Sequence, residues 1–157
     1  MVATIWFKRI NDTHGHDAGD RVLCDAAEII RNAAARPELC ARFGGEEFVV
    51  LCPGALAGEA VALAETIRLA VAAHVAVRNG TQVGMTISCG VAERTAGMAD
   101  ADALLRQADT ALYAAKEQGR NRTYVLGCDG AIRAVECGEP VGGPAQAAVA
   151  RHTTTRR

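Results

Sequence analysis

The sequence predicts an α+β fold within one domain of ordinary size. Three segments repeat apolar residues at helical spacing, one segment alternates apolar and polar residues as a strand does, and two short β-prone runs flank a glycine pair. Half of the 157 residues are apolar, which is enough to bury a sizeable core without disulfides or metal ions. We therefore expect helices and strands to share one hydrophobic core.

The first predicted helix begins near Asp20 and ends at Arg36, before Pro37. Its apolar residues recur every three or four positions, so they define one buried face. They are Val22, Leu23, Ala26, Ala27, Ile30 and Ala33. Upstream of this helix, residues 2–5 have the composition of a short strand.

A β-hairpin is predicted next. Residues 41–43 and 48–51 are β-prone, and residues 44–47 between them form a four-residue connection. The connection contains two glycines followed by two glutamates, so one turn combines backbone conformational freedom with two negative charges.

The remaining elements alternate between helix and strand. Residues 59–73 predict a second helix, and residues 82–92 alternate like a half-buried strand. Asp100 or Asp102 is expected to cap a third helix that stops at Gly119. Residues 123–126 supply the last predicted strand.

Composition divides the chain at residue 126. Residues 1–126 carry the periodic segments and are assigned to the domain. Residues 127–157 are rich in glycine and alanine without a sustained period, so they are expected to form a disordered tail.

The charges nearly cancel, at 17 basic against 18 acidic residues and a net charge of -1. Such a balance argues against a nucleic-acid partner, so an anionic ligand must be held by a local site. No apolar run is long enough to span a membrane, and a cytoplasmic location is expected. The six cysteines contain no C-x-x-C pair and are interpreted as reduced residues, mostly of the core.

The hairpin connection has the chemistry of a nucleotide site. Gly44 and Gly45 carry no side chain, so a flat ligand can approach and the turn can adopt positive φ. Glu46 and Glu47 offer hard oxygen ligands for Mg²⁺ bridging substrate phosphates. A solvated turn with charged residues remains the alternative for these residues taken alone.

Residues 7–20 are dense in polar groups. A carboxylate such as Asp20 can accept the two N–H groups of a guanine edge, and the amide of Asn11 can bond the same base. The alternative for Asp20 is a helix N-cap. His14 and His16 suggest a metal pair, but a simple loop position explains them as well.

Two basic residues close the third predicted helix. Lys116 and Arg120 are four residues apart, so they can face the same way and hold phosphate oxygens. Basic residues also complement the dipole at a helix C-terminus, which is the alternative.

Taken together, four motifs resemble the GGDEF family of diguanylate cyclases. They are F-K-x-I-N-D-x-x-G-H-x-x-G-D, R-F-G-G-E-E-F, T-I-S-C-G-V-A and A-D-x-A-L-Y-x-A-K-x-x-G-R-N, and the resemblance covers about residues 6–125. It implies a central, mainly antiparallel sheet flanked by helices, similar to nucleotidyl cyclase cores. It also implies that two domains meet as a homodimer and condense two GTP into cyclic di-GMP and two pyrophosphates.

The resemblance also assigns roles to residues of this chain. Glu46 would bind Mg²⁺, or Mn²⁺ in its place, and Glu47 would assist catalysis by binding metal or by activating the 3′-hydroxyl. The implied substrate-binding residues are Asn11 and Asp20 for guanine, Gly44 and Gly45 for close approach, and Lys8, Lys116 and Arg120, the last two for phosphates.

The sequence departs from the family at its start. Family members have D-x-D before the F-K pair, where this chain has Ala3-Thr4-Ile5, so a metal-binding carboxylate is absent. The agreement from Phe7 onward suggests that residues 1–6 are a foreign start on a truncated domain that lacks its N-terminal sensor. The alternative function is therefore an inactive module that binds GTP or another protein.

Overall fold

The computed structural model describes residues 1–34, 36, 39–78 and 80–136. Within them, eight strands and four helices follow one another along the chain. No helix among the described residues is long and apolar enough to cross a membrane. The order is β1 (Val2–Ile5), α1 (Phe7–His14), α2 (His16–Ala33), β2 (Cys40–Arg42), β3 (Glu47–Val50), α3 (Ala57–Ala73), β4 (Val75–Arg78), β5 (Thr81–Gly84), β6 (Ile87–Ala92), α4 (Ala101–Glu117), β7 (Thr123–Leu126) and β8 (Ile132–Ala134).

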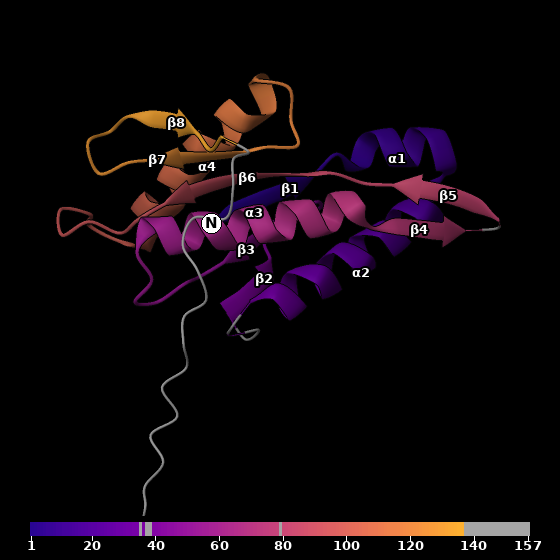
Figure 1. The fold of residues 1–157 in the computed structure, drawn as a ribbon, viewed down its shortest axis with the longest axis horizontal. Coiled ribbons are helices and arrows are strands. Elements are labelled where there is room, and N and C mark those ends of the chain that lie inside the picture. Colours follow the sequence, from indigo (N-terminus) through magenta and orange to yellow (C-terminus); the bar gives the residue numbers. More distant parts are fainter. Residues whose placement is uncertain (35, 37–38, 79, 137–157) are drawn as a thin grey trace, which may run out of the picture.

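Six strands form one mixed sheet in the order β2-β3-β1-β6-β7-β8, and β4 and β5 form a separate hairpin (Figure 1). All neighbours in the large sheet are antiparallel except β6 and β7. Strand β1 is central, because Ala3 pairs with Phe48 of β3 on one edge and with Cys89 of β6 on the other. The predicted α+β fold with a mainly antiparallel sheet is confirmed.

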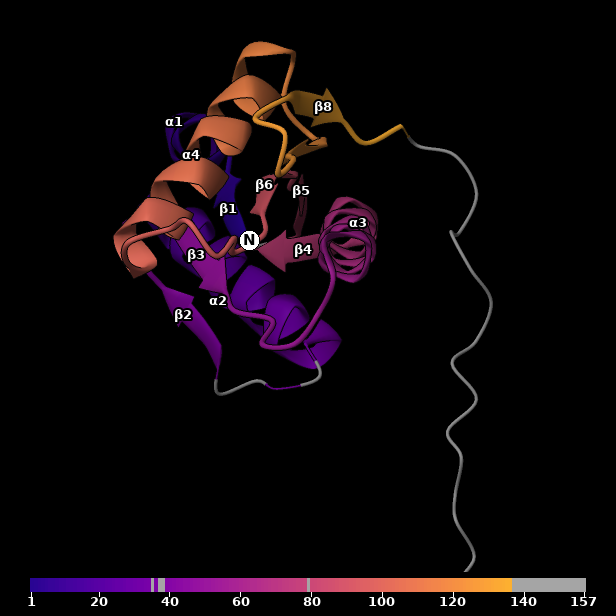
Figure 2. The ribbon, with the colours of Figure 1, turned by 90° about the vertical axis from the view of Figure 1, so that its left-hand side faces the viewer.

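Helices cover both faces of the sheet. The end-on view of Figure 2 shows α4 on one side and α2 with α3 on the other. The larger core lies on the α2 and α3 side and includes Ala3, Ile5 and Ile87. Val2 and Val49 face the other way and pack on α4.

Strand β6 is buried on both faces, because helices lie against each of them. Cys89 points toward α3, where its thiol lies 3.9 Å from the carbonyl oxygen of Ala64, and burial raises its pKa to about 12. On the opposite face a Cβ added at Gly90 would come within 2.1 Å of the Ala108 carbonyl oxygen and 2.3 Å of the Leu112 nitrogen. Glycine is therefore what lets α4 lie directly on the sheet.

Two predicted elements differ from those in the structure. The helix predicted from Asp20 starts at His16, and residues 7–14 form a helix of their own, because Gly15 at φ 82° separates the two. The strand predicted over residues 82–92 is β5 and β6, which lie in different sheets. Alternation continues through Met85, which is buried, so the pattern itself contains no break.

The predicted tail begins too early. Residues 132–134 form β8, which pairs with β7, and the Asp129 carboxylate accepts from the Ala131 backbone and the Arg133 side chain in the connecting turn. All three β8 residues are exposed, so no apolar pattern marked this strand. Residues 137–157 of the predicted tail lie outside the described residues.

The cysteine prediction is partly wrong. Of the cysteines that the structure describes, Cys89 alone is fully buried. Cys40 and Cys52 are half-buried, and Cys24 and Cys128 are exposed.

The contact between α4 and β6 gives a stability prediction. We expect Gly90→Ala to lower the free energy of unfolding by about 2 kcal/mol or more, since the new methyl meets helix backbone that cannot rotate away. Urea unfolding followed by circular dichroism measures this change. The matched control is Gly58→Ala in α3, where nothing lies within 4 Å of the added carbon. Equal stability of the two variants would contradict the close packing.

Candidate functional site

The first part of the site is the contact between α1 and α2. A Cβ added at Gly19 would lie 1.9 Å from Oδ1 of Asn11 and 2.6 Å from the ring of Phe7, so the two helices touch where α2 has no side chain. Asn11 of α1 therefore lies against α2 one residue before Asp20. Oδ1 of Asn11 is buried and has no hydrogen-bond partner among the described residues. An unused acceptor and a carboxylate are groups that suit the N–H groups of a guanine edge.

Asp20 lies in the second turn of α2, so the alternative reading of this residue as an N-cap is wrong. His14 closes α1 and His16 opens α2, so neither lies in an extended loop. The part of the chain that the structure describes holds no group of three His, Cys, Asp or Glu side chains suited to a metal.

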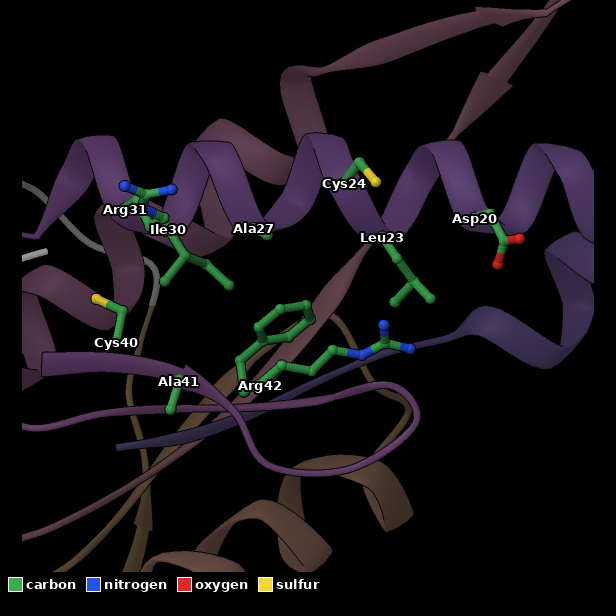
Figure 3. Close-up of a pocket in the computed structure, with 10 residues that line it drawn as sticks. Asp20, Leu23, Cys24, Ala27, Ile30, Arg31, Cys40, Ala41 and Arg42 are labelled. Atoms are coloured by element: carbon green, nitrogen blue, oxygen red, sulfur yellow. The ribbon is translucent and has the colours of Figure 1, made fainter. Parts of the chain in front are cut away.

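A groove of about 500 Å³ lies beside Asp20, between α2 and the hairpin (Figure 3). Leu23 lines it from α2, and Phe48 and Arg42 line it from the hairpin. Cavities of this size and mixed apolar lining are typical of small-molecule sites. In Figure 3 the guanidinium of Arg42 lies across from Leu23 and Asp20, so this wall carries charge as well as apolar surface.

Arg42 also fixes the hairpin tip. Its guanidinium donates to the carbonyl oxygens of Gly44 and Gly45, and the nitrogen of Phe43 donates to the carbonyl oxygen of Glu47 at 2.8 Å. The connection spans residues 43–46, one residue earlier than predicted. Neither glycine has a positive φ, so the predicted conformational reason is wrong. Nothing lies within 4 Å of a Cβ added at Gly45, which leaves the space open for a ligand.

The two glutamates of the hairpin lie near Lys116 of α4. The Lys116 ammonium is 3.5 Å from Oε1 of Glu47, which joins the end of the third predicted helix to the hairpin. Partial burial raises the pKa of Glu46; the charge of Lys116 opposes this shift and that of Glu47 adds to it. The folded structure therefore disfavours the ionised form of Glu46, and such raised carboxyl pKa values are common at functional sites.

The residues present suit a divalent ion that is shared with substrate phosphates. Thr4 pairs directly with Glu47, so both side chains stand on the same face of the sheet, and the Thr4 hydroxyl is buried without a partner in the described structure. Mg²⁺ is commonly held by one or two carboxylates together with phosphate oxygens. Glu46 and Glu47 can supply these carboxylates, whereas Ala3 supplies no ligand.

The segment after α4 is held in an unusual conformation. Arg120 and Asn121 have positive φ, at 60° and 46°. The Asn121 nitrogen donates to the Ser88 hydroxyl at 3.2 Å, and the nearly buried guanidinium of Arg68 donates to the Asn121 side-chain oxygen at 3.2 Å. Arg68 and Ser88 therefore fix the backbone from which Arg120 extends. The sequence did not predict this role for Arg68, and Ser88 belongs to the T-I-S-C-G-V-A motif without an assigned role.

The guanidinium of Arg120 lies over the ring of Trp6, 4.8 Å from its centre. Trp6 precedes α1, and no side chain caps the N–H groups of that helix. Lys8 is exposed in the first turn of α1, and within the described part of the chain no hydrogen bond or ion pair joins it to the other predicted site residues. Free N–H groups and nearby cations make the start of α1 suited to phosphate.

Comparison with known proteins agrees with this geometry. The family model described as "Diguanylate cyclase, GGDEF domain" matches residues 1–122, so residues 1–6 lie inside the match. Among curated proteins, Diguanylate cyclase A of Treponema denticola is 41% identical over 122 residues, which is 78% of this chain and 33% of that protein. The chain spans about a third of the length of the curated relatives it matches.

Solved structures show the same fold. The GGDEF domain of DgcB from Caulobacter crescentus, in complex with c-di-GMP, aligns with a TM-score of 0.75 and 38% identity, covering 79% of this chain and 74% of that one. The active GGEEF domain of a diguanylate cyclase from Vibrio cholerae aligns with a TM-score of 0.71 and 35% identity, covering 79% of each. The predicted resemblance is confirmed.

The raised pKa of Glu46 gives a prediction about pH. A carboxyl whose pKa is higher in the folded than in the unfolded state stabilises the fold while it is protonated. This stabilisation is lost as pH rises through the folded pKa and the carboxyl ionises. We expect Glu46→Gln to be more stable than the parent at pH 7 by less than about 1 kcal/mol, because the carboxyl is partly exposed. The gain should vanish below the ordinary glutamate pKa of about 4.3.

Urea unfolding at pH 7 and at about pH 3.5 measures both values. Glu28→Gln, at an exposed position in the middle of α2, is the control and should change little at either pH. A Glu46→Gln variant less stable than the parent at pH 7 would contradict the desolvation of this carboxylate.

Proposed function

Because the chain belongs to the GGDEF family of diguanylate cyclases, we propose that it binds GTP and that two copies condense two GTP into cyclic di-GMP and two pyrophosphates. One observation supports the proposal: α1 contacts α2 at Gly19, where Oδ1 of Asn11 has no partner among the described residues, and the following residue, Asp20, lines an open groove. Such a pair recognises the polar edge of guanine better than that of adenine.

The phosphates would lie between the start of α1 and the hairpin tip. Uncapped N–H groups of α1, Lys8, Lys116 and Arg120 would bind their oxygens. A divalent ion, Mg²⁺ or Mn²⁺, would be held by Glu46 and Glu47 with these oxygens, and when bound it neutralises the charge that develops during phosphoryl transfer.

The reaction needs two copies of the site. The 3′-hydroxyl of each GTP attacks the α-phosphorus of the other, and pyrophosphate leaves as the new P–O bond forms. Glu47 would accept the hydroxyl proton, and its half-buried side chain at the hairpin supports this role. Arranging the two nucleotides and balancing their charge supplies most of the acceleration.

The second candidate is a module that binds GTP without turnover. Position 3 favours it, because Ala3 is fully buried opposite Phe48 and supplies no oxygen where a carboxylate occurs in the family pattern. Changes to residues that only support metal ligands typically lower metal affinity or activity about 10- to 100-fold, and loss of a direct ligand should lower it at least as much.

Guanine selectivity tests the binding half of the proposal. We expect Asp20→Ala to weaken GTP binding about 10- to 100-fold and to leave ATP binding unchanged, since only the guanine edge loses a partner. Calorimetry with GTP and ATP measures both affinities. Arg106→Ala, at the start of α4, is the control and should bind GTP like the parent. Equal affinity of the parent for GTP and ATP would contradict a guanine site.

The variant Ala3→Asp separates the two candidate functions. Without ligand it should lower the melting temperature, because a carboxylate replaces a fully buried methyl. With GTP and Mg²⁺ it should recover that loss and form cyclic di-GMP at least about tenfold faster than the parent. Chromatography of the products and thermal melting give the two readouts. A parent without turnover and a variant without gain would leave GTP binding as the function.

A further inference from the structure

Trp6 stands at the junction between β1 and α1 and is the chain's one tryptophan. It is 41% exposed, although an apolar ring of this size usually gains most from burial. Its backbone nitrogen donates to the carbonyl oxygen of Thr86 at 3.4 Å, so the backbone at this position is tied to the chain just before β6. The exposed ring is therefore fixed at its base and open to solvent along part of its surface.

Two arginines share this ring. The guanidinium carbon of Arg9 lies 5.1 Å from the ring centre and that of Arg120 lies 4.8 Å from it. Arg9 comes from the first turn of α1, whereas Arg120 follows the C-terminus of α4. Segments from opposite ends of the domain thus meet on one side chain.

Neither arginine has a carboxylate partner among the described residues. Two like charges repel when they gather, and the aromatic face offsets this repulsion only in part. An anion that bridges the two guanidinium groups would remove the repulsion and form charge-assisted hydrogen bonds with both. An anion would therefore balance the two positive charges that lie against this ring.

The backbone of Arg120 is fixed, but its side chain has several free torsions. Arg68 and Ser88 hold Asn121, and the Arg120 nitrogen donates to the carbonyl oxygen of Ala115 at 3.0 Å. The ring of Trp6 then restricts where the guanidinium can lie. Restricting a long side chain before binding lowers the entropy lost when the ligand arrives.

We propose that Trp6 is a positioning residue that holds Arg120 and Arg9 as a two-arginine clamp for the pyrophosphate portion of the bound nucleotide. The clamp rests on the proposed function for the identity of the nucleotide, and it adds Arg9 and Trp6 to the groups that recognise it. The ligand chemistry is a polyphosphate, because two forked donors match several oxygens on adjacent phosphorus atoms.

Binding of inorganic pyrophosphate tests the clamp directly. Calorimetry should show about fivefold weaker binding to Trp6→Leu than to the parent, because leucine keeps apolar bulk and loses the aromatic face. Trp6→Phe should stay within about twofold of the parent, since a ring remains. Guanosine, which has no phosphate, should bind all three proteins equally. A merely structural role of Trp6 would weaken guanosine and pyrophosphate together.

A double-substitution cycle tests the link between Trp6 and Arg120. In a background of Arg120→Ala, the change Trp6→Leu should cause less than about a twofold further loss of pyrophosphate affinity. Arg9→Ala should also weaken pyrophosphate binding, whereas Arg106→Ala at the other end of α4 removes the same charge and should not. Independent, additive losses from Trp6 and Arg120 would overturn the positioning role.

Emission from Trp6 gives a readout that needs no variant. Pyrophosphate should change the emission intensity of the parent as the guanidinium groups shift toward the anion, and guanosine should not. Equal GTP affinity of the parent and Trp6→Leu would overturn the clamp and leave the proposed function standing. Binding of pyrophosphate but of neither GTP nor guanosine would support the clamp and overturn the proposed function.

Discussion

The pairing of β1 on both edges is the constraint on which the site depends. This strand has four residues, and its ladder to β3 continues into a bond from the Ile5 nitrogen to the carbonyl oxygen of Glu46. The hairpin tip is therefore held next to the point where the chain enters α1. On the other edge, pairing with β6 places the same junction beside Thr86 and Ser88. A slip of one residue in either register would turn every side chain of β1 to the opposite face and separate the carboxylates from α4.

Two glycines let helices pack closely around the candidate site. At Gly19 the absence of a Cβ lets α1 approach α2, and at Gly90 it lets α4 approach β6. The first contact brings Asn11 against α2, and the second brings α4 against the sheet. A methyl group at Gly90 would meet the backbone of α4, and one at Gly19 would meet the side chains of Asn11 and Phe7.

Motif spacing predicts guanine, hairpin and phosphate residues, and their roles remain part of the proposed function. Helical periodicity located α2, α3 and α4 to within a few residues. It could not locate α1, because a polar eight-residue helix buries only Ile10. It could not separate β5 from β6, because alternation runs through the bend between them. Arg68 and Trp6 were not predicted, because their roles come from tertiary contacts, which leave no periodic signal along the chain. Arg42 belongs to a quoted motif, but the motif alone did not predict its hydrogen bonds to Gly44 and Gly45.

Several polar groups of the candidate site are not fully stabilised by contacts within the fold. They are the two neighbouring glutamates, the buried hydroxyl of Thr4, which has no partner among the described residues, and the two arginines over the ring of Trp6. Ligand phosphates and a divalent ion have the charges that satisfy these needs together, since the cation suits the glutamates and the anion suits the arginines. Ala3 does not contribute to this charge compensation, because its methyl group only packs in the core. The proposed nucleotide contacts are therefore more complete in this chain than the proposed metal ligands.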